Sequence, residues 1–252
     1  SVLTHTDKDV EVILVDNGSK SGGLGKLIDK FRDTRVSILS VGANRSFSEG
    51  SNIGAESATG EILVFLNNNV MVTENWLAPL VQELQANPSA GAVGPKFLYP
   101  DGSIREAGAF LDRNARSVQR GKGRASGAGL FNEKREVQYL SANCFATRKK
   151  HFLKVGGFNF VYEPGNYEDA DLGFSLRAAG LTIVYQPEST VIDIGTQATS
   201  ATGDTPLVEG VVEMNRIKFL NRWGNGKTPS RLSLDSQAPP KAITSGGPTV
   251  VI

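Results

Sequence analysis

Residues 62–69 read Ile-Leu-Val-Phe-Leu-Asn-Asn-Asn, and this stretch decides the fold. Five consecutive apolar residues predict a short strand that is buried on both faces, as in a sheet covered by helices. The strand ends on Asn67, Asn68 and Asn69, whose side-chain amides both donate and accept hydrogen bonds. Ligands of open α/β sheets bind at the carboxyl ends of the strands, so we expect these asparagines to face a ligand. Considered alone, they also suit a plain polar turn.

Strands and helices alternate on both sides of this stretch. Apolar runs predict further strands at residues 10–16, 36–39, 92–94, 137–146 and 181–185. Helical spacing predicts helices at residues 24–31, 52–58, 75–84, 169–179 and 209–223. This alternation predicts an α/β fold with a mostly parallel central sheet flanked by helices. Residues 100–135 are rich in Gly, Ser, Arg and Lys, which indicates either a substrate-covering loop or a disordered insertion.

The composition is ordinary for a globular protein, with 39% hydrophobic and 21% charged residues. A formal net charge of +1 gives no support for nucleic-acid binding, which needs a strongly basic surface. The single cysteine, Cys144, excludes an internal disulfide and suits a reducing compartment. No apolar run approaches the roughly 20 residues of a membrane span. We therefore expect a cytoplasmic protein, either free or held peripherally at the inner face of the membrane.

Acidic residues recur where predicted strands end or helices begin. Asp16 ends the first strand before a turn, which suits a contact with a nucleobase or ribose but equally a turn cap. Glu168, Asp169 and Asp171 crowd one helix start, although favourable charge at a helix N-terminus needs fewer carboxylates. Like charges this close raise at least one pKa, which is useful for a general base. Asp193 stands between two aliphatic residues, and a solvent-facing strand edge is its alternative interpretation.

In this order, these motifs resemble the inverting family-2 glycosyltransferases, which have the GT-A fold. Asp16 falls at the nucleotide-binding strand end, Asn44 lies in the adjacent loop, and residues 67–69 stand where the metal-binding acidic motif belongs. Residues 100–108, with Pro-Asp-Gly and Glu-Ala-Gly, are similar to a stretch of rhamnosyl- and related bacterial polysaccharide transferases. Residues 156–177 look like the acceptor-side block that carries the catalytic base. The resemblance covers most of the chain.

The resemblance implies a nucleotide-diphosphate sugar, a UDP- or dTDP-sugar, as the donor. Asp16 would contact the base, most often uracil, and Asn44, Asn67 and Asn68 would lie beside the nucleotide. The donor would lie across the carboxyl edge of the sheet, where the diphosphate becomes the leaving group.

The acceptor implied by the resemblance is a hydroxyl of a glycan or a lipid-linked saccharide. A carboxylate, best assigned to Asp169, would remove the proton from this hydroxyl. The oxygen would then attack the anomeric carbon from the face opposite the diphosphate, so the configuration inverts. Glu168 and Asp171 would shape the acceptor site or hold the acceptor hydroxyls.

Two departures from the family affect the implied metal site. The last acid of the strand-end motif is Asn69 here, and a frequent family histidine falls in the stretch that contains Asp193. We hypothesise that the changes compensate, so that Asn69 and Asp193 hold Mg²⁺ or Mn²⁺ through oxygen atoms. The cation would neutralise the diphosphate. The rival is a non-catalytic glycosyltransferase-like domain that binds nucleotide sugar or glycan, or scaffolds a larger multidomain enzyme.

The ends of the chain also differ from the family pattern. Residues 1–224 are expected to form the glycosyltransferase-like domain, and no strand before Val10 corresponds to the family's first strand. Residues 225–252 are rich in Pro, Ser and Gly, which predicts a tail or linker. Residues 249–252, Thr-Val-Val-Ile, either begin a further domain or fill the vacant strand position, in cis or from a neighbouring molecule. A tandem-domain protein and a homo-oligomer both stay open.

Two other α/β classes fit the sequence less well. A nucleotidyltransferase would carry a pyrophosphate loop rich in Gly and Lys near the N-terminus, which the sequence lacks. A dinucleotide-binding domain would show Gly-x-Gly-x-x-Gly between a strand and a helix, and no such motif is present.

Overall fold

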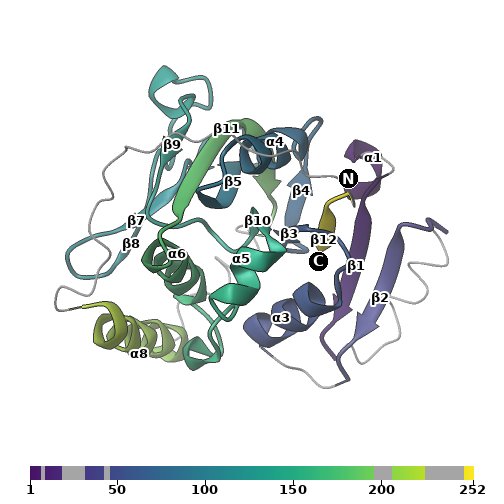
Figure 1. Ribbon diagram of the computed structural model, residues 1–252. Coiled ribbons are helices and arrows are strands. Elements are labelled where there is room, and N and C mark those ends of the chain that lie inside the picture. Colours follow the sequence, from purple (N-terminus) through teal and green to yellow (C-terminus); the bar gives the residue numbers. More distant parts are fainter. Residues whose placement is uncertain (7–8, 19–31, 43–45, 196–205, 225–246) are drawn as a thin grey trace.

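The computed structural model describes residues 1–6, 9–18, 32–42, 46–195, 206–224 and 247–252. In these residues one mixed sheet forms the centre of the protein, and helices cover both of its faces (Figure 1). Its strands are β1 (Glu11–Asp16), β2 (Val36–Ser40), β3 (Ile62–Leu66), β4 (Val70–Val72), β5 (Ala90–Leu98), β6 (Ile104–Glu106), β9 (Arg135–Glu136), β10 (Cys144–Arg148), β11 (Thr182–Asp193) and β12 (Thr249–Val251). A separate hairpin joins β7 (Ala109–Leu111) to β8 (Ser117–Gln119).

The main path of the sheet runs β2-β1-β12-β3-β10-β5-β11-β4, with β6 paired to β5 and β9 to β11. Strands β2, β1, β12, β3, β5 and β11 run in one direction. Strand β10 opposes both of its neighbours, and β4 opposes β11. The predicted α/β fold with a mostly parallel sheet is therefore confirmed.

The helices are α1 (Val2–His5), α3 (Phe47–Ser57), α4 (Ala78–Ala86), α5 (Lys149–Lys154), α6 (Glu168–Ala178) and α8 (Pro206–Trp223), with the 3-10 turns η1 (Gly129–Phe131) and η2 (Phe160–Tyr162). Both faces of the sheet carry buried apolar side chains at β3. Its residues Val64 and Leu66 pack into a core with α4, whereas Leu63 and Phe65 pack into a core with α3, α5 and α6. None of the helices in the described part of the chain is long and apolar enough to span a bilayer.

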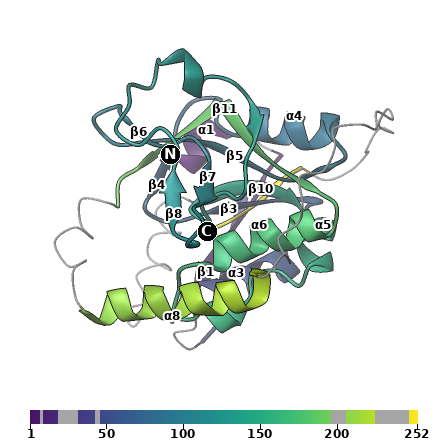
Figure 2. The same cartoon turned by 90° about the vertical axis from the view of Figure 1, so that its left-hand side faces the viewer.

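Helix α8 lies beside α6 (Figure 2), and the two helices share a separate hydrophobic cluster. Its Phe219 meets Phe174 of α6 edge to face, with ring centroids 5.0 Å apart. Trp223 packs against the same Phe174 ring. Helices α6 and α8 thus form one packed unit beside the sheet.

Strand β12, from the C-terminal end of the chain, lies between β1 and β3 and runs parallel to both (Figure 1). Val250 pairs with Val12 on one side and Val64 on the other, and it is fully buried. Of the alternatives for residues 249–252, the structure shows the filling of the vacant strand position in cis. The rest of the predicted tail, residues 225–246, lies outside the described residues.

We call the space between β1 and β3 that β12 occupies the β12 slot. It is narrow, because two glycine residues lie directly against β12. A Cβ atom at Gly54 would lie 2.5 Å from Val251 Cγ1, and one at Gly60 would lie 2.4 Å from Thr249 Oγ1. The Gly60 N–H donates to Thr249 Oγ1 at 2.9 Å, and that hydroxyl donates to Glu11 Oε2 at 2.9 Å. The buried threonine is thereby satisfied on both sides.

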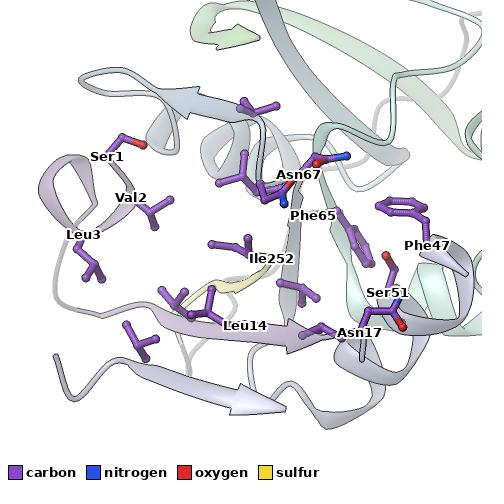
Figure 3. A pocket seen from close by; sticks show the side chains of 18 of the residues that line it. Ser1, Val2, Leu3, Leu14, Asn17, Phe47, Ser51, Phe65, Asn67 and Ile252 are labelled. Atoms are coloured by element: carbon purple, nitrogen blue, oxygen red, sulfur yellow. The ribbon is translucent and has the colours of Figure 1, made fainter. Parts of the chain in front are cut away.

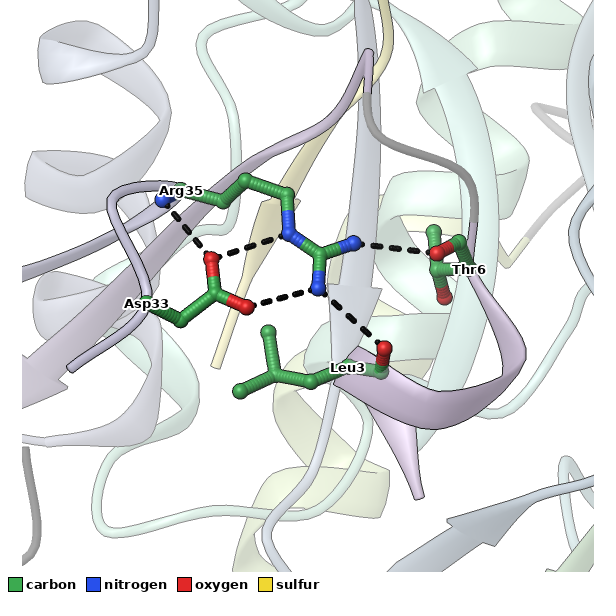
Figure 4. Close-up of polar contacts among 4 residues, drawn as sticks. All are labelled: Leu3, Thr6, Asp33 and Arg35. Carbon is green, nitrogen blue, oxygen red and sulfur yellow. Dashed lines mark hydrogen bonds and ion pairs between the residues drawn. The ribbon is translucent and has the colours of Figure 1, made fainter. Parts of the chain in front are cut away.

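Arg35 fixes α1 beside β2 (Figure 4). Its guanidinium donates to the carbonyl oxygens of Leu3 and Thr6 at 3.1 and 3.0 Å. It also forms a bidentate pair with Asp33, at 3.0 and 2.7 Å, and this pairing lowers the pKa of Asp33 to about 2. A rigid, charge-assisted contact of this kind holds the short helix in place.

Several element boundaries differ from the sequence-based expectations. Helix α3 begins at Phe47, before the predicted 52–58, because the Ser46 side chain accepts the Glu49 N–H at 3.1 Å and caps the helix. Residues 100–135 are not a disordered insertion, since they contain β6, β7, β8, η1 and the start of β9. The predicted strand at 137–146 begins only at Cys144. The helix expected at residues 24–31 lies outside the described residues.

Candidate active site

A cavity of about 790 Å³ opens where β1, β12 and β3 end (Figure 3). This volume is within the usual range of ligand pockets. Asn17, Ser51, Asn67 and Asn68 provide polar lining. Apolar side chains from α1, β1, β3 and the C-terminal end form most of the remaining wall, among them Val2, Leu3, Leu14, Phe65 and Ile252. The cavity therefore combines an apolar body with neutral amides at the sheet edge.

The three asparagines after β3 face different surroundings. Asn67 is oriented by Asn143, whose backbone carbonyl accepts its N–H at 2.8 Å and whose Oδ1 accepts its Nδ2 at 3.2 Å. Asn68 is exposed and lines the cavity. Asn69 lies against β11, because its carbonyl oxygen accepts the Ile194 N–H at 2.9 Å. The predicted asparagine motif thus joins the cavity to the β11 edge.

The predicted nucleotide contacts fall at the other side of the cavity. Asp16 ends β1, and the following residue, Asn17, is the one that lines the cavity. Asn44 lies outside the described residues. The predicted contact of Asp16 with a base stays a prediction.

The β11 edge carries a buried ion pair. Asp193 is 1% exposed, and its Oδ2 lies 2.8 Å from Arg105 Nε on β6. Its Oδ1 accepts the Gly195 N–H at 2.9 Å. A Cβ atom at Gly195 would lie 2.1 Å from Asn69 Nδ2, so only glycine permits this approach of the two segments. Asn69 and Asp193 are therefore neighbours, as the metal hypothesis requires.

The donor set nevertheless fits a divalent cation poorly. In the described ranges, no three His, Cys, Asp or Glu side chains lie close enough together to hold a metal ion. Asn69 Oδ1 is buried and has no hydrogen-bond partner among the described residues, so it could accept a cation, but it is neutral. The charge of Asp193 is already balanced by Arg105. A cation bound to this carboxylate would have to displace a guanidinium or lie against it.

Two carboxylates, Glu168 and Asp169, open α6, and the charge of Asp169 also acts on Glu106 of β6, so we call these three residues the carboxylate cluster. Tyr167, with a left-handed φ of 78°, leads into the helix and places Glu168 and Asp169 in its first turn. Burial raises the pKa of Asp169, and burial together with the charge of Asp169 raises the pKa of Glu168. Glu168 Oε2 is buried and has no hydrogen-bond partner within the described segments. A carboxylate with a raised pKa suits proton transfer near neutral pH.

Glu106 completes the cluster, and it was not among the predicted site residues. It is 3% exposed, and its pKa is raised to about 7, mainly by burial. The charge of Arg105 opposes this rise in pKa, and the charges of Asp169 and Asp193 contribute to it. The Glu-Ala-Gly stretch at 106–108 was the available signal, because it is similar to the transferase motif. Arg105 had no comparable signal in the sequence.

Asp171 differs from the other acidic residues of α6. It is 2% exposed, and its Oδ1 accepts from Tyr162 Oη at 2.9 Å and from Trp223 Nε1 at 2.6 Å. Arg222 Nε lies 3.2 Å from the same oxygen. These contacts use Asp171 to join α8 to α6. The predicted contact of Asp171 with the acceptor stays a prediction.

Comparison with protein families identifies the chain. Residues 1–156 match the model described as glycosyl transferase family 2. The chain belongs to this family. The matched region includes the asparagine motif, Arg105 and Glu106, whereas Asp169 and Asp193 lie beyond it.

Two curated relatives illustrate the range of proteins to which this family-2 chain is similar. It is 29% identical over 188 residues to the O-antigen biosynthesis protein RfbC of Myxococcus xanthus, covering 72% of this chain and 15% of that protein. It is 28% identical over 222 residues to the N-acetylglucosaminyl-diphospho-decaprenol L-rhamnosyltransferase of Mycobacterium tuberculosis, covering 76% of this chain and 69% of that protein. The chain thus spans a small part of the first relative and about two thirds of the second.

Solved structures show that the fold is the GT-A fold. The structure of GalNAc-T7 with UDP, GalNAc and Mn²⁺ matches with a TM-score of 0.63 at 17% identity, over 77% of this chain and 39% of that chain. The mannosyltransferase PcManGT from Pyrobaculum calidifontis, with GDP-Man and Mn²⁺, matches with a TM-score of 0.52 at 16% identity, over 85% and 62%. Both neighbours are thus described with a nucleotide and Mn²⁺.

Proposed function

We propose that this family-2 chain is an inverting glycosyltransferase. It transfers a sugar from a nucleotide-diphosphate donor, a UDP- or dTDP-sugar, to a hydroxyl of a glycan or lipid-linked saccharide. The observation that carries the proposal is the position of Asp169, a partly buried carboxylate with a raised pKa at the start of α6. The nucleotide-bound neighbours and the amide-lined cavity support the donor, and the names of the two relatives support a role in cell-surface polysaccharide assembly.

In the proposed reaction, the cavity holds the nucleotide, and Asn67 and Asn68 lie beside it. Asp169 takes the proton of the acceptor hydroxyl, because a raised pKa brings this carboxylate nearer the pH at which a base is effective. The deprotonated oxygen attacks the anomeric carbon opposite the diphosphate, which leaves with the bonding electrons. The configuration at that carbon inverts. Glu168, buried beside Asp169, helps to shape the acceptor side.

A bound Mg²⁺ or Mn²⁺ stays a prediction for this chain. It would neutralise the diphosphate if Asn69 and Asp193 held it. The ion pair between Asp193 and Arg105 argues against that donor set. The same observation favours the second candidate function, a glycosyltransferase-like domain that binds nucleotide sugar or glycan without transferring it.

A donor screen separates the two candidates. Binding and hydrolysis of UDP-, GDP- and dTDP-sugars would be measured with and without Mn²⁺. The proposed transferase binds at least one donor and slowly hydrolyses it, and Asp169→Asn abolishes the hydrolysis while binding persists. Binding without hydrolysis by the unmodified chain favours the non-catalytic domain, and no binding to any nucleotide favours a scaffold.

A further inference from the structure

A guanidinium stands at the edge of the sheet where the family resemblance implies a divalent cation. Arg105 Nε lies 2.8 Å from Asp193 Oδ2, and Asp193 pairs across the sheet with Val70, the residue after the asparagine motif. We propose that Arg105, rather than a metal ion, supplies the positive charge that stabilises the diphosphate leaving group in this chain. This inference rests on the proposed glycosyltransferase function and deepens it.

The charges of Arg105, Asp193 and Asn69 support a role for arginine in place of a metal ion. Arg105 and Asp193 together carry no net charge, so the pair offers no attraction to a divalent cation. Asn69, which stands where the family's last motif acid would be, contributes only a neutral oxygen. A metal site built from these residues has one carboxylate, and that carboxylate is already paired with Arg105, whereas Mg²⁺ and Mn²⁺ are held by anionic oxygen ligands. An approaching diphosphate could instead bind the guanidinium N–H groups that Asp193 does not use, among them Nη1.

Arginine is also chemically suited to this task. Its planar guanidinium can bind two phosphate oxygens at once through parallel N–H bonds. Arg105 Nη1 is buried and has no hydrogen-bond partner in the described part of the chain, although Glu106 Oε2 lies 3.8 Å away. Buried polar groups are normally paired, so an unused N–H indicates capacity for a ligand. The side chain keeps 17% exposure, so the group is not sealed from solvent.

The location of Arg105 connects the two sides of the site. Its charge lowers the pKa of Asp169 and of Glu106, which means that the guanidinium lies within electrostatic reach of the carboxylate cluster. Arg105 also contacts Asp193 at the end of β11, and the next residue, Ile194, donates its N–H to the carbonyl oxygen of Asn69. A group in this position can interact with the leaving diphosphate while the base acts on the acceptor. A purely structural ion pair would not affect diphosphate binding, and this difference can be measured.

The test is calorimetric binding of UDP, dTDP and uridine to the whole chain, in EDTA and in Mn²⁺. Comparing UDP with uridine isolates the contribution of the diphosphate. We expect at least one nucleotide to bind in EDTA within about threefold of its affinity in Mn²⁺. We expect Arg105→Gln to weaken diphosphate binding at least tenfold, about 1.4 kcal/mol, and to leave uridine binding unchanged. Arg216→Gln is the matched control, because Arg216 is 19% exposed, close to the 17% of Arg105, and forms its ion pair with Glu213 within α8.

Arg105→Gln leaves Asp193 buried and unpaired, which can prevent folding. The double variant Arg105→Gln/Asp193→Asn removes both charges and provides a second measurement with the same expected loss. Binding that requires Mn²⁺, or a preference for UDP over uridine that survives in the folded variants, overturns the inference. If neither UDP nor dTDP binds in any condition, the proposed function itself is wrong, and the inference is wrong with it.

Discussion

The cavity and the carboxylate cluster lie in one fold but differ in charge and in construction. Apart from Asp33, which is paired with Arg35, the cavity is lined by uncharged polar and apolar side chains, and its walls include α1 and β1 on one side and β12 on the other. The carboxylate cluster is ionisable, with Glu106 buried and Glu168 and Asp169 partly buried, and it comes from β6 and the start of α6. The shape of the cavity depends on the packing of segments that are far apart in the sequence, whereas the properties of the carboxylate cluster depend on the charges of its side chains. Mutations in the first region should therefore lower stability, whereas mutations in the second should alter the reaction rate or the pH dependence of stability.

The largest effect is expected from a charge placed in β12. Val250→Asp buries a carboxylate between β1 and β3, where no partner could satisfy it, and we expect a loss of more than about 4 kcal/mol of unfolding free energy. Urea denaturation followed by circular dichroism measures the effect. Ile38→Asp on β2 is the control, because Ile38 is 38% exposed and its variant should remain folded. A stable Val250→Asp protein would show that β12 is not part of the sheet in solution.

A smaller loss, in rate rather than in stability, is expected in the carboxylate cluster. Asp169→Asn should lower the turnover of the donor identified in the screen by about 10²–10⁴-fold, because the base is removed. Its unfolding free energy should not fall, since burial already disfavours the charged carboxylate. Steady-state kinetics and urea denaturation test the two parts. Glu188→Gln, an exposed change on β11, should leave the rate unaltered, and an active Asp169→Asn enzyme would remove Asp169 from the mechanism.

Glu106 gives a pH dependence of stability with a defined sign. Its folded pKa of about 7 exceeds the ordinary value of 4.5, so the folded state holds more protons and unfolding free energy falls as pH rises between these values. For each protein we compare the unfolding free energy at pH 5 with that at pH 8. We expect this difference to be about 2–3 kcal/mol smaller in Glu106→Gln than in the parent. Denaturation of both proteins at both pH values supplies the measurement. An unchanged difference would mean that Glu106 is not protonated preferentially in the fold.

The smallest expected effect is steric and again concerns the β12 slot. Gly54→Ala places a methyl group 2.5 Å from Val251 Cγ1, so we expect a net loss of about 1–2 kcal/mol despite the higher helix propensity of alanine. Gly210→Ala in α8 is the matched control. No atom of the described residues lies within 4 Å of a Cβ atom there, so that variant should be slightly more stable than the parent. Equal stabilisation of both variants would mean that β12 leaves the slot easily.

The parts of the fold that were predictable are those with local patterns. The apolar run 62–66 became β3, and its two-sided packing follows from five adjacent apolar residues. The acidic start of α6 and the strand 10–16 were also readable, because each combines a periodic pattern with a local signal. The position of β12 was only one of several alternatives, since strand pairing over a long sequence separation leaves no local trace.

The candidate site was predicted less completely because its contacts are non-local. The sequence placed Asn69 and Asp193 together, and they are neighbours across β4 and β11. The sequence did not show that Arg105 forms an ion pair with Asp193, since no pattern near either residue predicts contact with the other. Asp171 resembled its neighbours in the sequence, whereas Tyr162 and Trp223 give it a packing role. Local patterns thus identified the residue types, and tertiary contacts separated their roles.

The anomeric configuration of the first product tests the central claim most directly. The whole chain would be incubated with the nucleotide sugar selected by the donor screen, whose own anomeric configuration is known, and the released or transferred sugar would be followed by proton NMR before mutarotation. The proposed inverting mechanism predicts that the first product has the anomeric configuration opposite to that of the donor and that Asp169→Asn forms it at least about 10²-fold more slowly. A first product with the configuration of the donor, or equal formation by Asp169→Asn, would contradict the account.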